Sequence, residues 1–285
     1  MSSLSSDLSD SLSKNNIFPN KKLGQCFLVS KKALEQIIKA SKIKKGEKIL
    51  EIGPGTGILT RELLNRGAKV VAVEKDKRLF EIIRDNFQKE IKEARLTLIK
   101  GDFLNLNFPR FLKDLNFKEK EYKVVSNLPY QITSPVLKVL LEENFLPKDI
   151  IITIQKEVAM RICAGKGELG SLSVMVQSCS KGCNIVNKFP PSYFKPQPEV
   201  DSALIKIEGL DYPKGIDINF LRNLLRIGFS SKRKKLAKNF KNVFPKEQID
   251  IIWEELNIPE NVRAEDLVVE KWGEIARKIK TWSTN

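Results

Sequence analysis

The chain has 285 residues, 41% of them hydrophobic, which is enough for one large domain with a buried core and a smaller second domain. It carries 50 Lys and Arg against 35 Asp and Glu, so the net charge of +15 favours a polyanionic partner, nucleic acid before an anionic membrane surface. No apolar run approaches the roughly 20 residues of a membrane span, and the N-terminus lacks the apolar core of a signal peptide, so we expect a cytoplasmic protein with no membrane partner.

The cysteines and the absence of histidine limit the available chemistry. Cys26, Cys163, Cys179 and Cys183 show no C-x-x-C spacing, and no His can complete a zinc site. We therefore expect no metal and reduced, structural thiols. Metal binding by Cys163, Cys179 and Cys183 is the minor alternative. Because His is the commonest general base, whatever reaction occurs must do without one.

The N-terminal part of the chain is predicted to contain a tail and a basic helix. Residues 1–20 are rich in Ser and are expected to form a flexible tail. Ser30 can cap a helix that carries Leu34, Ile37 and Ile38 on one face. The many lysines around this helix either form a solvated face or contact phosphates, and the sequence leaves both open.

The stretch 48–60, KILEIGPGTGILT, is typical of a strand, a tight turn and the start of a helix. Gly53, Gly55 and Gly57 lack the Cβ atoms that would collide with a close ligand, and the first N–H groups of the helix can face that ligand. The spacing is G-x-G-x-G and differs from the G-x-G-x-x-G of dinucleotide sites, so a ligand without phosphates fits better. An ordinary strand–helix turn is the alternative.

Two further strands are predicted to end at a carboxylate. Strand 69–73 ends at Glu74, at the interval expected for an acceptor of ribose hydroxyls, which favours adenosine with an uncharged 5′ substituent as the ligand. A helix over 76–91 leads to strand 96–99, which is followed by Asp102. This alternation predicts a parallel sheet with helices on both faces, in which the carboxyl ends of the strands meet in one crevice. Asp102 either contacts the adenine amino group or caps the next segment.

A fourth strand, 122–126, ends at the sequence Asn127-Leu128-Pro129-Tyr130. Pro129 keeps Leu128 extended, so that the Leu128 carbonyl can point into the crevice beside the Asn127 side-chain oxygen. Tyr130 adds a flat aromatic face. Two acceptors and a stacking plane suit a planar base that bears an NH2 group, whereas a plain turn with a buried Tyr is the alternative.

The rest of the first domain is predicted to contain three more strands. They span 149–155, 183–189 and 201–207, with helices over 156–164 and 171–178. The connection 190–198 holds four prolines and is stiff enough to present Phe194 as an apolar wall, although core filler is an equal reading of this residue.

From about residue 209 the alternation stops, and the pattern predicts a small helical domain with helices over 216–227, 231–240, 246–257 and 265–281. No acidic residue lies between Ile218 and Lys246, whereas basic residues are dense there. With Phe229 and Phe240 as anchors, this block favours a helical clamp for a phosphate backbone.

An ordered set of motifs resembles one family. KKLGQCFL, EIGPGTGILT, VEKD, GDF, NLPYQITSP, QKEVAMRI, PPSYFKPQPEVDSA and FSSKRKKL are similar, from about Lys21 to Phe240, to the bacterial ribosomal RNA adenine dimethyltransferases of the RsmA/KsgA type. The resemblance implies a Rossmann-like α/β domain with a seven-stranded sheet over residues 21–208 and a small all-helical, RNA-binding domain over 209–285. It also implies dimethylation of two adjacent adenosines in the 3′-terminal hairpin of 16S rRNA, with S-adenosylmethionine as the methyl donor, in immature small ribosomal subunits. We expect a monomer.

The resemblance also assigns roles to residues. It implies cofactor binding by Cys26, Leu28, Gly53, Glu74, Asp102 and Asn127, and catalysis by Asn127, Leu128, Pro129, Tyr130 and Phe194. The glycine turn adds Gly55 and Gly57 to the expected cofactor-binding residues. The basic block adds the expected RNA-binding residues Lys232, Arg233, Lys234, Lys235 and Lys238. The family usually has Asn or His where this chain has Cys26, which leaves a backbone contact as the expected one at that position. In the implied reaction Asn127 and the Leu128 carbonyl accept the adenine N–H groups, while Tyr130 and Phe194 sandwich the base.

Three rival functions differ in their motifs. The 23S rRNA adenine methyltransferases of macrolide resistance typically read Asn-Ile-Pro where this chain has Asn127-Leu128-Pro129. A DNA adenine methyltransferase would carry an acidic residue in place of Asn127. A non-catalytic ribosome-assembly factor would not need the intact sequence from Asn127 to Tyr130.

Overall fold

The computed structural model describes residues 18–20, 24–142, 145–231 and 233–282. Most of the expected tail, residues 1–17, therefore lies outside the described residues. The chain forms two compact units: the first runs to residue 159 and resumes over 184–208, and the second contains 160–183 and the chain from 209 onward. A single boundary after residue 208 was expected. Residues 160–183 instead group with the second unit because α9 (Ser171–Ser178) packs against the helices α10 (Ile218–Gly228) and α13 (Val269–Trp282).

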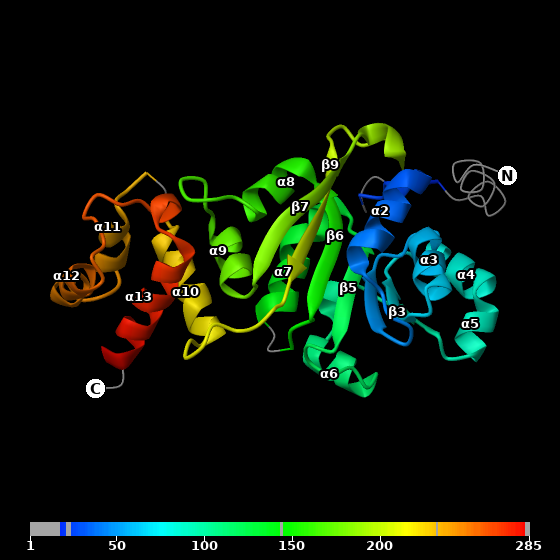
Figure 1. Ribbon diagram of the computed structural model, residues 1–285, viewed down its shortest axis with the longest axis horizontal. Helices are drawn as coiled ribbons and strands as arrows, with labels where there is room; N and C mark the ends of the chain where they lie inside the picture. The colour runs from blue at the N-terminus through cyan, green and yellow to red at the C-terminus, as the bar shows by residue number, and fades with distance from the viewer. Residues whose placement is uncertain (1–17, 21–23, 143–144, 232, 283–285) are drawn as a thin grey trace. The chain divides into compact units, whose positions relative to one another are not determined.

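The first unit is built on the expected seven-stranded sheet (Figure 1). Its strands are β2 (Lys48–Ile52), β3 (Lys69–Glu74), β4 (Leu96–Lys100), β5 (Tyr122–Asn127), β6 (Asp149–Gln155), β7 (Gly182–Phe189) and β9 (Ser202–Glu208). They lie in the order β4-β3-β2-β5-β6-β9-β7, with parallel pairing from β4 through β6 and antiparallel pairing between β6 and β9. The carboxyl ends of β2, β3, β4 and β5 therefore meet at one edge, as the alternation of elements predicts.

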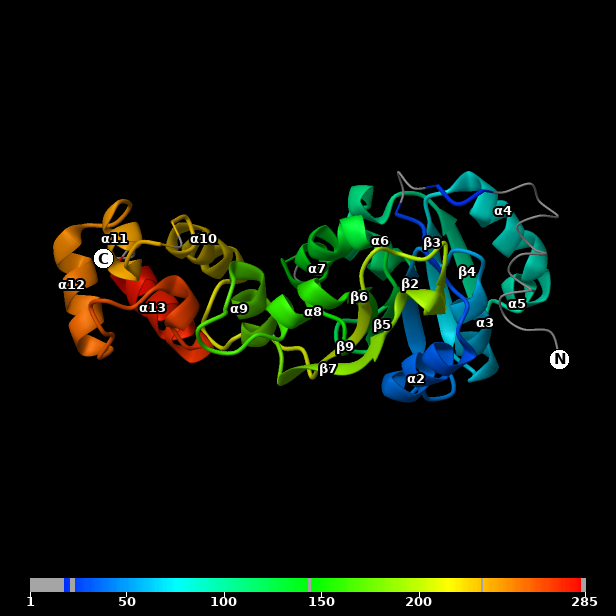
Figure 2. The same ribbon diagram turned by 90° about the horizontal axis from the view of Figure 1, so that it is seen from above.

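Helices cover both faces of this sheet. They are α2 (Lys31–Ser41), α3 (Ile58–Asn65), α4 (Lys77–Asn86), α5 (Gln88–Lys92), α6 (Phe108–Asp114) and α7 (Thr133–Glu142). A further helix, α8 (Lys156–Ile162), follows β6 and contains the boundary between the two units. Figure 2 shows α2 and α7 on opposite faces. The predicted helix over 76–91 is divided at Phe87, where φ is −123°. The helix α6 and a short antiparallel pair between β1 (Phe27–Leu28) and β8 (Phe194–Lys195) were not predicted.

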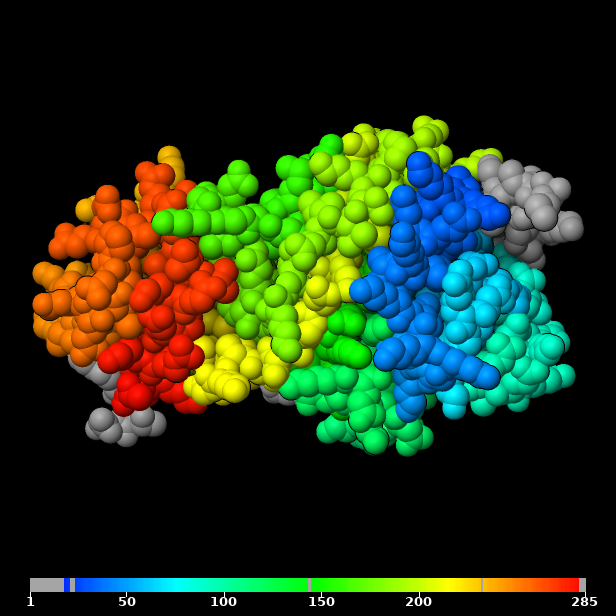
Figure 3. Space-filling view, in the orientation of Figure 1, coloured from blue at the N-terminus to red at the C-terminus, as the bar shows by residue number. Residues whose placement is uncertain are grey.

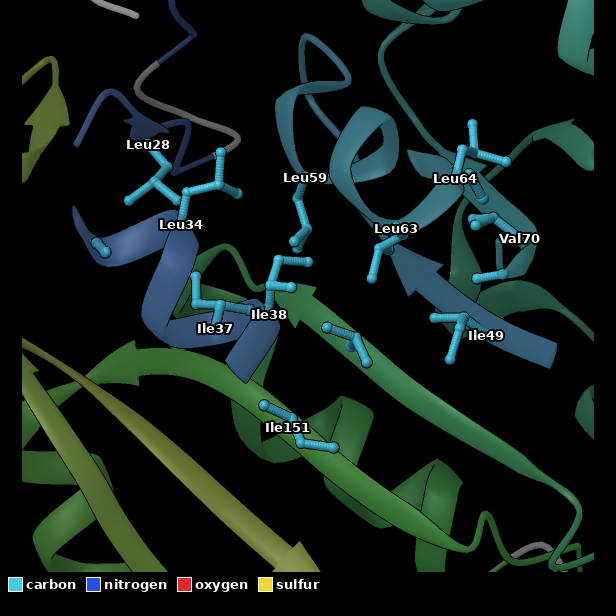
Figure 4. Packing of buried hydrophobic residues seen from close by; sticks show 14 of the residues in the cluster. Leu28, Leu34, Ile37, Ile38, Ile49, Leu59, Leu63, Leu64, Val70 and Ile151 are labelled. Carbon is cyan, nitrogen blue, oxygen red and sulfur yellow. The ribbon is translucent and has the colours of Figure 1, made fainter. Parts of the chain in front are cut away.

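The core of the first unit forms where α2 and α3 pack on the sheet. Ser30 caps α2 by accepting a hydrogen bond from Ala33 N at 3.2 Å, and the apolar residues one helical turn apart then face inward. Figure 4 shows Ile37 and Ile38 of α2 and Leu59 and Leu63 of α3 directed toward the strand residues. In the space-filling view α2 and α3 lie side by side on the surface (Figure 3).

The second unit is helical, with α9, α10, α11 (Leu236–Lys241), α12 (Lys246–Glu255) and α13. Its core is aromatic: Phe240 and Trp272 are fully buried, Trp253 meets Phe240 edge to face, and Phe229 stacks on Trp272 with centroids 5.1 Å apart. A Cβ atom on Gly228 would lie 2.4 Å from the Trp272 ring, so α10 approaches α13 only because glycine occupies this position.

Residues 233–235, directly before α11, form a turn. A helix over 231–240 was predicted, but α11 begins at Leu236, so the interpretation of residues 233–235 as helical is wrong. The reason lies in buried Asn239, whose amide donates to the carbonyls of Gly228 and Ser231 at 2.7 and 3.2 Å and holds the chain in a loop. Lys232 lies outside the described residues. In the described ranges no helix is long and apolar enough to cross a bilayer.

Candidate active site

The glycine turn connects β2 to α3 with three residues in the left-handed region. Gly53, Gly55 and Gly57 have φ values of 66°, 64° and 85°. A Cβ on Gly55 would lie 3.1 Å from the Phe27 ring, and one on Gly57 would lie 2.7 Å from Phe87. The glycines are therefore required both by the backbone conformation and by the close packing of two aromatic rings on the turn.

Glu74 at the end of β3 is joined to this turn. One carboxyl oxygen accepts from Gly55 N at 3.1 Å and the other from Asp76 N at 2.8 Å. Burial raises the pKa of Glu74 to about 7 in spite of these hydrogen bonds. A carboxylate has about four acceptor sites, so Glu74 retains capacity for ribose hydroxyls.

Glu51 is a site residue that the sequence analysis missed. It lines the same pocket as Glu74, is 1% exposed, and accepts a hydrogen bond from the Thr60 hydroxyl at 2.7 Å. Burial raises its pKa to about 8. The available signal was an acidic residue within the apolar strand KILEI, directly before the glycine turn.

Asp102 follows β4 and caps the next segment, which is one of the two roles predicted for it. It accepts from Leu104 N at 3.1 Å at the start of a short 3-10 turn (Phe103–Asn105), and its other oxygen pairs with Lys75 at 2.8 Å. Burial raises the pKa of Asp102, but the hydrogen bonds from Lys75 and Leu104 outweigh it and leave the pKa below its ordinary value. Because Asp102 and Phe103 also line the pocket, the cap does not remove Asp102 from the site.

Asn127 at the end of β5 is oriented by the backbone of Cys26. Its amide nitrogen donates to the Cys26 carbonyl at 3.2 Å, which turns the amide oxygen away from Cys26. The Cys26 thiol is half-buried, and burial raises its pKa. The backbone carbonyl alone links Cys26 to Asn127, so this contact does not depend on the side chain at position 26.

The three residues after Asn127 are fixed by different contacts. The Leu128 N–H donates to the Thr153 carbonyl at 3.1 Å, while its side chain is buried. Pro129 is extended, with φ −56° and ψ 131°, and Tyr130 opens a single turn of 3-10 helix. The Tyr130 hydroxyl shares a hydrogen bond of 2.6 Å with Ser202, which is fully buried at the start of β9. Burial raises the Tyr130 pKa.

The strand ends and the N-terminal segment enclose one pocket within the first unit. It brings together most of the predicted site residues, namely Cys26, Leu28, Gly53, Gly55, Glu74, Asp102, Asn127, Leu128, Pro129 and Tyr130. Gly57 does not line it and instead begins α3, without a side-chain cap. The aromatic side chain of Phe103 and the amide of Gln131 also line the pocket, and sequence reasoning did not select them.

Phe194 lies elsewhere in the first unit. It is 1% exposed, belongs to the hydrophobic core cluster, and does not line the pocket. Its backbone pairs with Leu28 through β8 and β1. In this structure Phe194 therefore supports the segment that carries Cys26 and Leu28. Of the two roles expected for Phe194, an apolar wall of the site or a core residue, this position corresponds to the core residue.

The predicted RNA-binding residues belong to the second unit. Arg233, Lys234 and Lys235 are exposed in the turn before α11, and Lys238 is exposed on α11. The Lys234 N–H donates to the Ser231 carbonyl at 3.1 Å, which shapes the turn.

Comparisons with known proteins identify the family. Residues 17–281 match the model of the ribosomal RNA adenine dimethylase family. The chain belongs to this family. It is 39% identical over 273 residues to a Nostoc protein named ribosomal RNA small subunit methyltransferase A, covering 92% of this chain and 98% of the relative. A Clostridium botulinum protein of the same name is 39% identical over 267 residues, covering 90% and 92%.

Solved structures agree with this assignment. A dimethyladenosine transferase from Plasmodium falciparum matches with a TM-score of 0.75 and 28% identity, covering 90% of this chain and 98% of that one. The 23S rRNA methyltransferase ErmE matches with a TM-score of 0.68 at 23% identity, covering 89% and 99%, which shows the fold alone. The predicted resemblance is confirmed: this adenine dimethylase family member is a methyltransferase with a Rossmann-like sheet, and its family and fold imply the use of S-adenosylmethionine.

Proposed function

We propose that this protein dimethylates the exocyclic amino groups of two adjacent adenosines in the 3′-terminal hairpin of 16S rRNA, acting as a monomer on immature small ribosomal subunits. The observation that carries the proposal is the Asn127 amide, which is held by Cys26 and lines the same pocket as Glu74. Family membership supplies the class of reaction, and the small-subunit relatives supply the choice of RNA.

The pocket residues fit S-adenosylmethionine. Glu51 and Glu74 are buried carboxyl groups that accept hydrogen bonds from the Thr60 hydroxyl and from backbone N–H groups. A ligand with a positive charge and hydroxyl groups is complementary to them, because it offers a counter-charge and further hydrogen-bond donors. Glu74 would accept the ribose hydroxyls, Asp102 and Phe103 would border the adenine, and the glycine turn allows close approach. When bound, the cofactor supplies an electrophilic methyl group. Cys26 and Leu28 would line its binding site from the N-terminal segment.

Asn127 and Leu128 would prepare the nucleophile. The amino lone pair of adenine is delocalised into the ring, and acceptors that bind its two N–H groups favour the geometry in which the lone pair attacks. The Asn127 amide oxygen is one such acceptor because its nitrogen is engaged by Cys26, and the Leu128 carbonyl is the second. The surplus proton leaves to water, so no histidine or strong base is needed.

Tyr130 would hold the base by stacking. Its hydroxyl is tied to buried Ser202, which fixes the plane of the ring beside the pocket. Phe194 is buried in this structure. It would provide a second stacking face for the base only if its ring left the core cluster when RNA binds. Pro129 keeps the chain extended between the acceptors and the aromatic ring.

The exposed cations of the second unit would bind the rRNA backbone. Arg233, Lys234, Lys235 and Lys238 are exposed, and phosphate contacts dominate RNA affinity. The same role is proposed for Lys232.

The test is a map of methylated positions. Immature 30S particles, naked 16S rRNA and 23S rRNA are each incubated with the protein and S-adenosylmethionine, and dimethyladenosine is located by mass spectrometry of RNase fragments. We expect two adjacent dimethyladenosines in the 3′-terminal hairpin of 16S rRNA and no modification of 23S rRNA. Modification of 23S rRNA would favour the macrolide-resistance activity, and binding without methylation would favour an assembly factor.

A further inference from the structure

Two cysteines that are distant in sequence meet in the second unit. Cys163 follows the last residue of α8, and Cys183 is the second residue of β7. Their sulfur atoms are 2.9 Å apart, both thiols are free, and both side chains are partly exposed. A disulfide requires about 2.05 Å between sulfurs, so bond formation needs a further approach of only about 0.9 Å.

The backbone on both sides of Cys163 is anchored. The Gln177 side chain on α9 donates hydrogen bonds to the carbonyls of Ile162 and Ala164 at 3.1 and 2.9 Å. Cys183 is part of a regular strand. The proximity of the two thiols is therefore set by secondary structure and by specific hydrogen bonds.

The third nearby cysteine does not join the pair. Cys179 is fully buried in the second unit, and the described residues contain no group of three Cys, His, Asp or Glu side chains arranged to hold a metal. A hydrogen bond from Cys183 lowers the pKa of Cys163, which makes Cys163 the better nucleophile.

We propose that Cys163 and Cys183 form a reversible disulfide when the protein meets a hydroperoxide. The Cys163 thiolate attacks one peroxide oxygen and breaks the O–O bond, which leaves Cys163 as a sulfenic acid and, for hydrogen peroxide, releases one water after protonation. The Cys183 sulfur then displaces the sulfenic oxygen, which leaves with the Cys183 proton as a second water. Two thiols are oxidised and one peroxide is reduced, and a dithiol such as dithiothreitol reverses the reaction.

The disulfide would close a ring that contains α9. Cys163 lies shortly after the chain enters the second unit, and Cys183 is the last residue before it returns to the first. A covalent link there restricts the unfolded chain and should raise the thermal midpoint of the protein. The oxidised site is independent of the proposed methylation chemistry, whose residues lie in the first unit.

Trypsin separates the three cysteines and makes the test direct. Cleavage after Arg161, Lys166, Lys181 and Lys188 places Cys163 in peptide 162–166, Cys179 in 167–181 and Cys183 in 182–188. The full-length protein is treated with hydrogen peroxide, free thiols are alkylated, and the digest is analysed without reduction. We expect peptides 162–166 and 182–188 to be linked, with a mass two hydrogens below their sum, and dithiothreitol to separate them.

Variants complete the experiment. Cys179→Ser is the matched control and should still form the link and show the rise in thermal midpoint, whereas Cys163→Ser and Cys183→Ser should show neither. If either of the latter variants fails to fold, the wild-type peptide map still decides. The proposal is overturned by a link to Cys179 or Cys26, by sulfinic acid at Cys163 without a link, or by four alkylatable thiols after peroxide treatment that fully oxidises glutathione.

Discussion

At the scale of single residues, two buried carboxyl groups make the pocket sensitive to pH. Glu51 and Glu74 both have raised pKa values, to about 8 and about 7, and in each case the principal cause is burial. Their protonated forms are favoured in the protein without ligand. A cationic ligand favours the ionised forms, so ligand binding and folding respond to pH in opposite directions.

Affinity for S-adenosylmethionine should rise with pH. Below a pKa of about 7, binding that requires ionised Glu74 weakens up to about tenfold for each pH unit. Calorimetry between about pH 5.5 and 8.5 measures this dependence. Glu74→Gln keeps an acceptor oxygen but cannot ionise, so it should bind more weakly at high pH and show a flatter profile. If wild type and Glu74→Gln show the same dependence of S-adenosylmethionine affinity on pH, ionisation of Glu74 does not control binding.

The stability of the protein without ligand should fall as the pH rises. Glu51 has a folded-state pKa of about 8, above its unfolded value of 4.5. The stabilising contribution of Glu51 to the free energy of unfolding is therefore complete below pH 4.5 and is lost progressively as the pH rises to about 8. The loss is up to about 1.4 kcal/mol for each pH unit between these two values. Thermal unfolding should show Glu51→Gln and wild type to be similar at low pH and the variant to be relatively more stable at high pH. A constant difference across the range would contradict the buried protonated acid.

At the scale of elements, the site depends on pairings between segments far apart in the chain. β9 supplies Ser202 to the turn after β5, and the segment before β1 supplies the Cys26 carbonyl to the end of β5. The first contact fixes Tyr130 and the second fixes Asn127. Ser202 does not line the pocket, so the first contact can be removed without changing a pocket residue.

Ser202→Ala should lower methyl transfer modestly and leave cofactor affinity unchanged. The lost hydrogen bond to Tyr130 is worth about 0.5–1.5 kcal/mol, and Tyr130→Phe removes the same bond while keeping the ring. The two single variants and the double variant should therefore have similar turnover rates in single-turnover assays. Additive losses would show that Ser202 and Tyr130 act separately.

Gly228→Ala should destabilise the second unit. The added Cβ would meet Trp272 at 2.4 Å, and overpacking of this kind costs about 1–3 kcal/mol. Gly165→Ala is the control within the same unit, because its Cβ would meet no atom within 4 Å. Urea midpoints compare the two variants. Equal midpoints would mean that α10 and α13 adjust without cost.

The elements themselves were largely predictable, and the failures have physical causes. Local periodicity and the glycine spacing predicted β2, the turn and α3, as well as Glu74 at the end of β3, because these signals lie within a few residues. The choice between an apolar wall and a core residue at Phe194 could not be made from the sequence, since it depends on the pairing of β8 with β1 across the chain. The helix over 231–240 was predicted from the local residue pattern, but the hydrogen bonds of Asn239 to Gly228 and Ser231 delay its start to Leu236.

At the scale of the whole molecule, the net charge of +15 and the basic turn point to the same polyanion. Replacing Arg233, Lys234 and Lys235 with Ala should weaken rRNA binding and reduce the slope of log affinity against log salt by roughly 0.7–0.9 for each lost phosphate contact. The control replaces three exposed lysines of the first unit, Lys77, Lys89 and Lys92, which changes the net charge equally. Filter binding over a salt series measures both. Equal slopes for the two triple variants would show an effect of net charge alone.

In the proposed reaction Asn127 assists methyl transfer itself, through an amide oriented by Cys26. Asn127→Ala should lower the single-turnover rate on immature 30S particles by about 10²–10³, the usual effect of losing one preorganised polar group at a reacting centre. Saturating S-adenosylmethionine and a parallel measurement of rRNA affinity remove binding effects, and Tyr130→Phe is the reference for a small loss. We expect the single-turnover rate of Asn127→Ala to lie far below that of Tyr130→Phe, with rRNA affinity unchanged. A wild-type rate for Asn127→Ala under these conditions would contradict it.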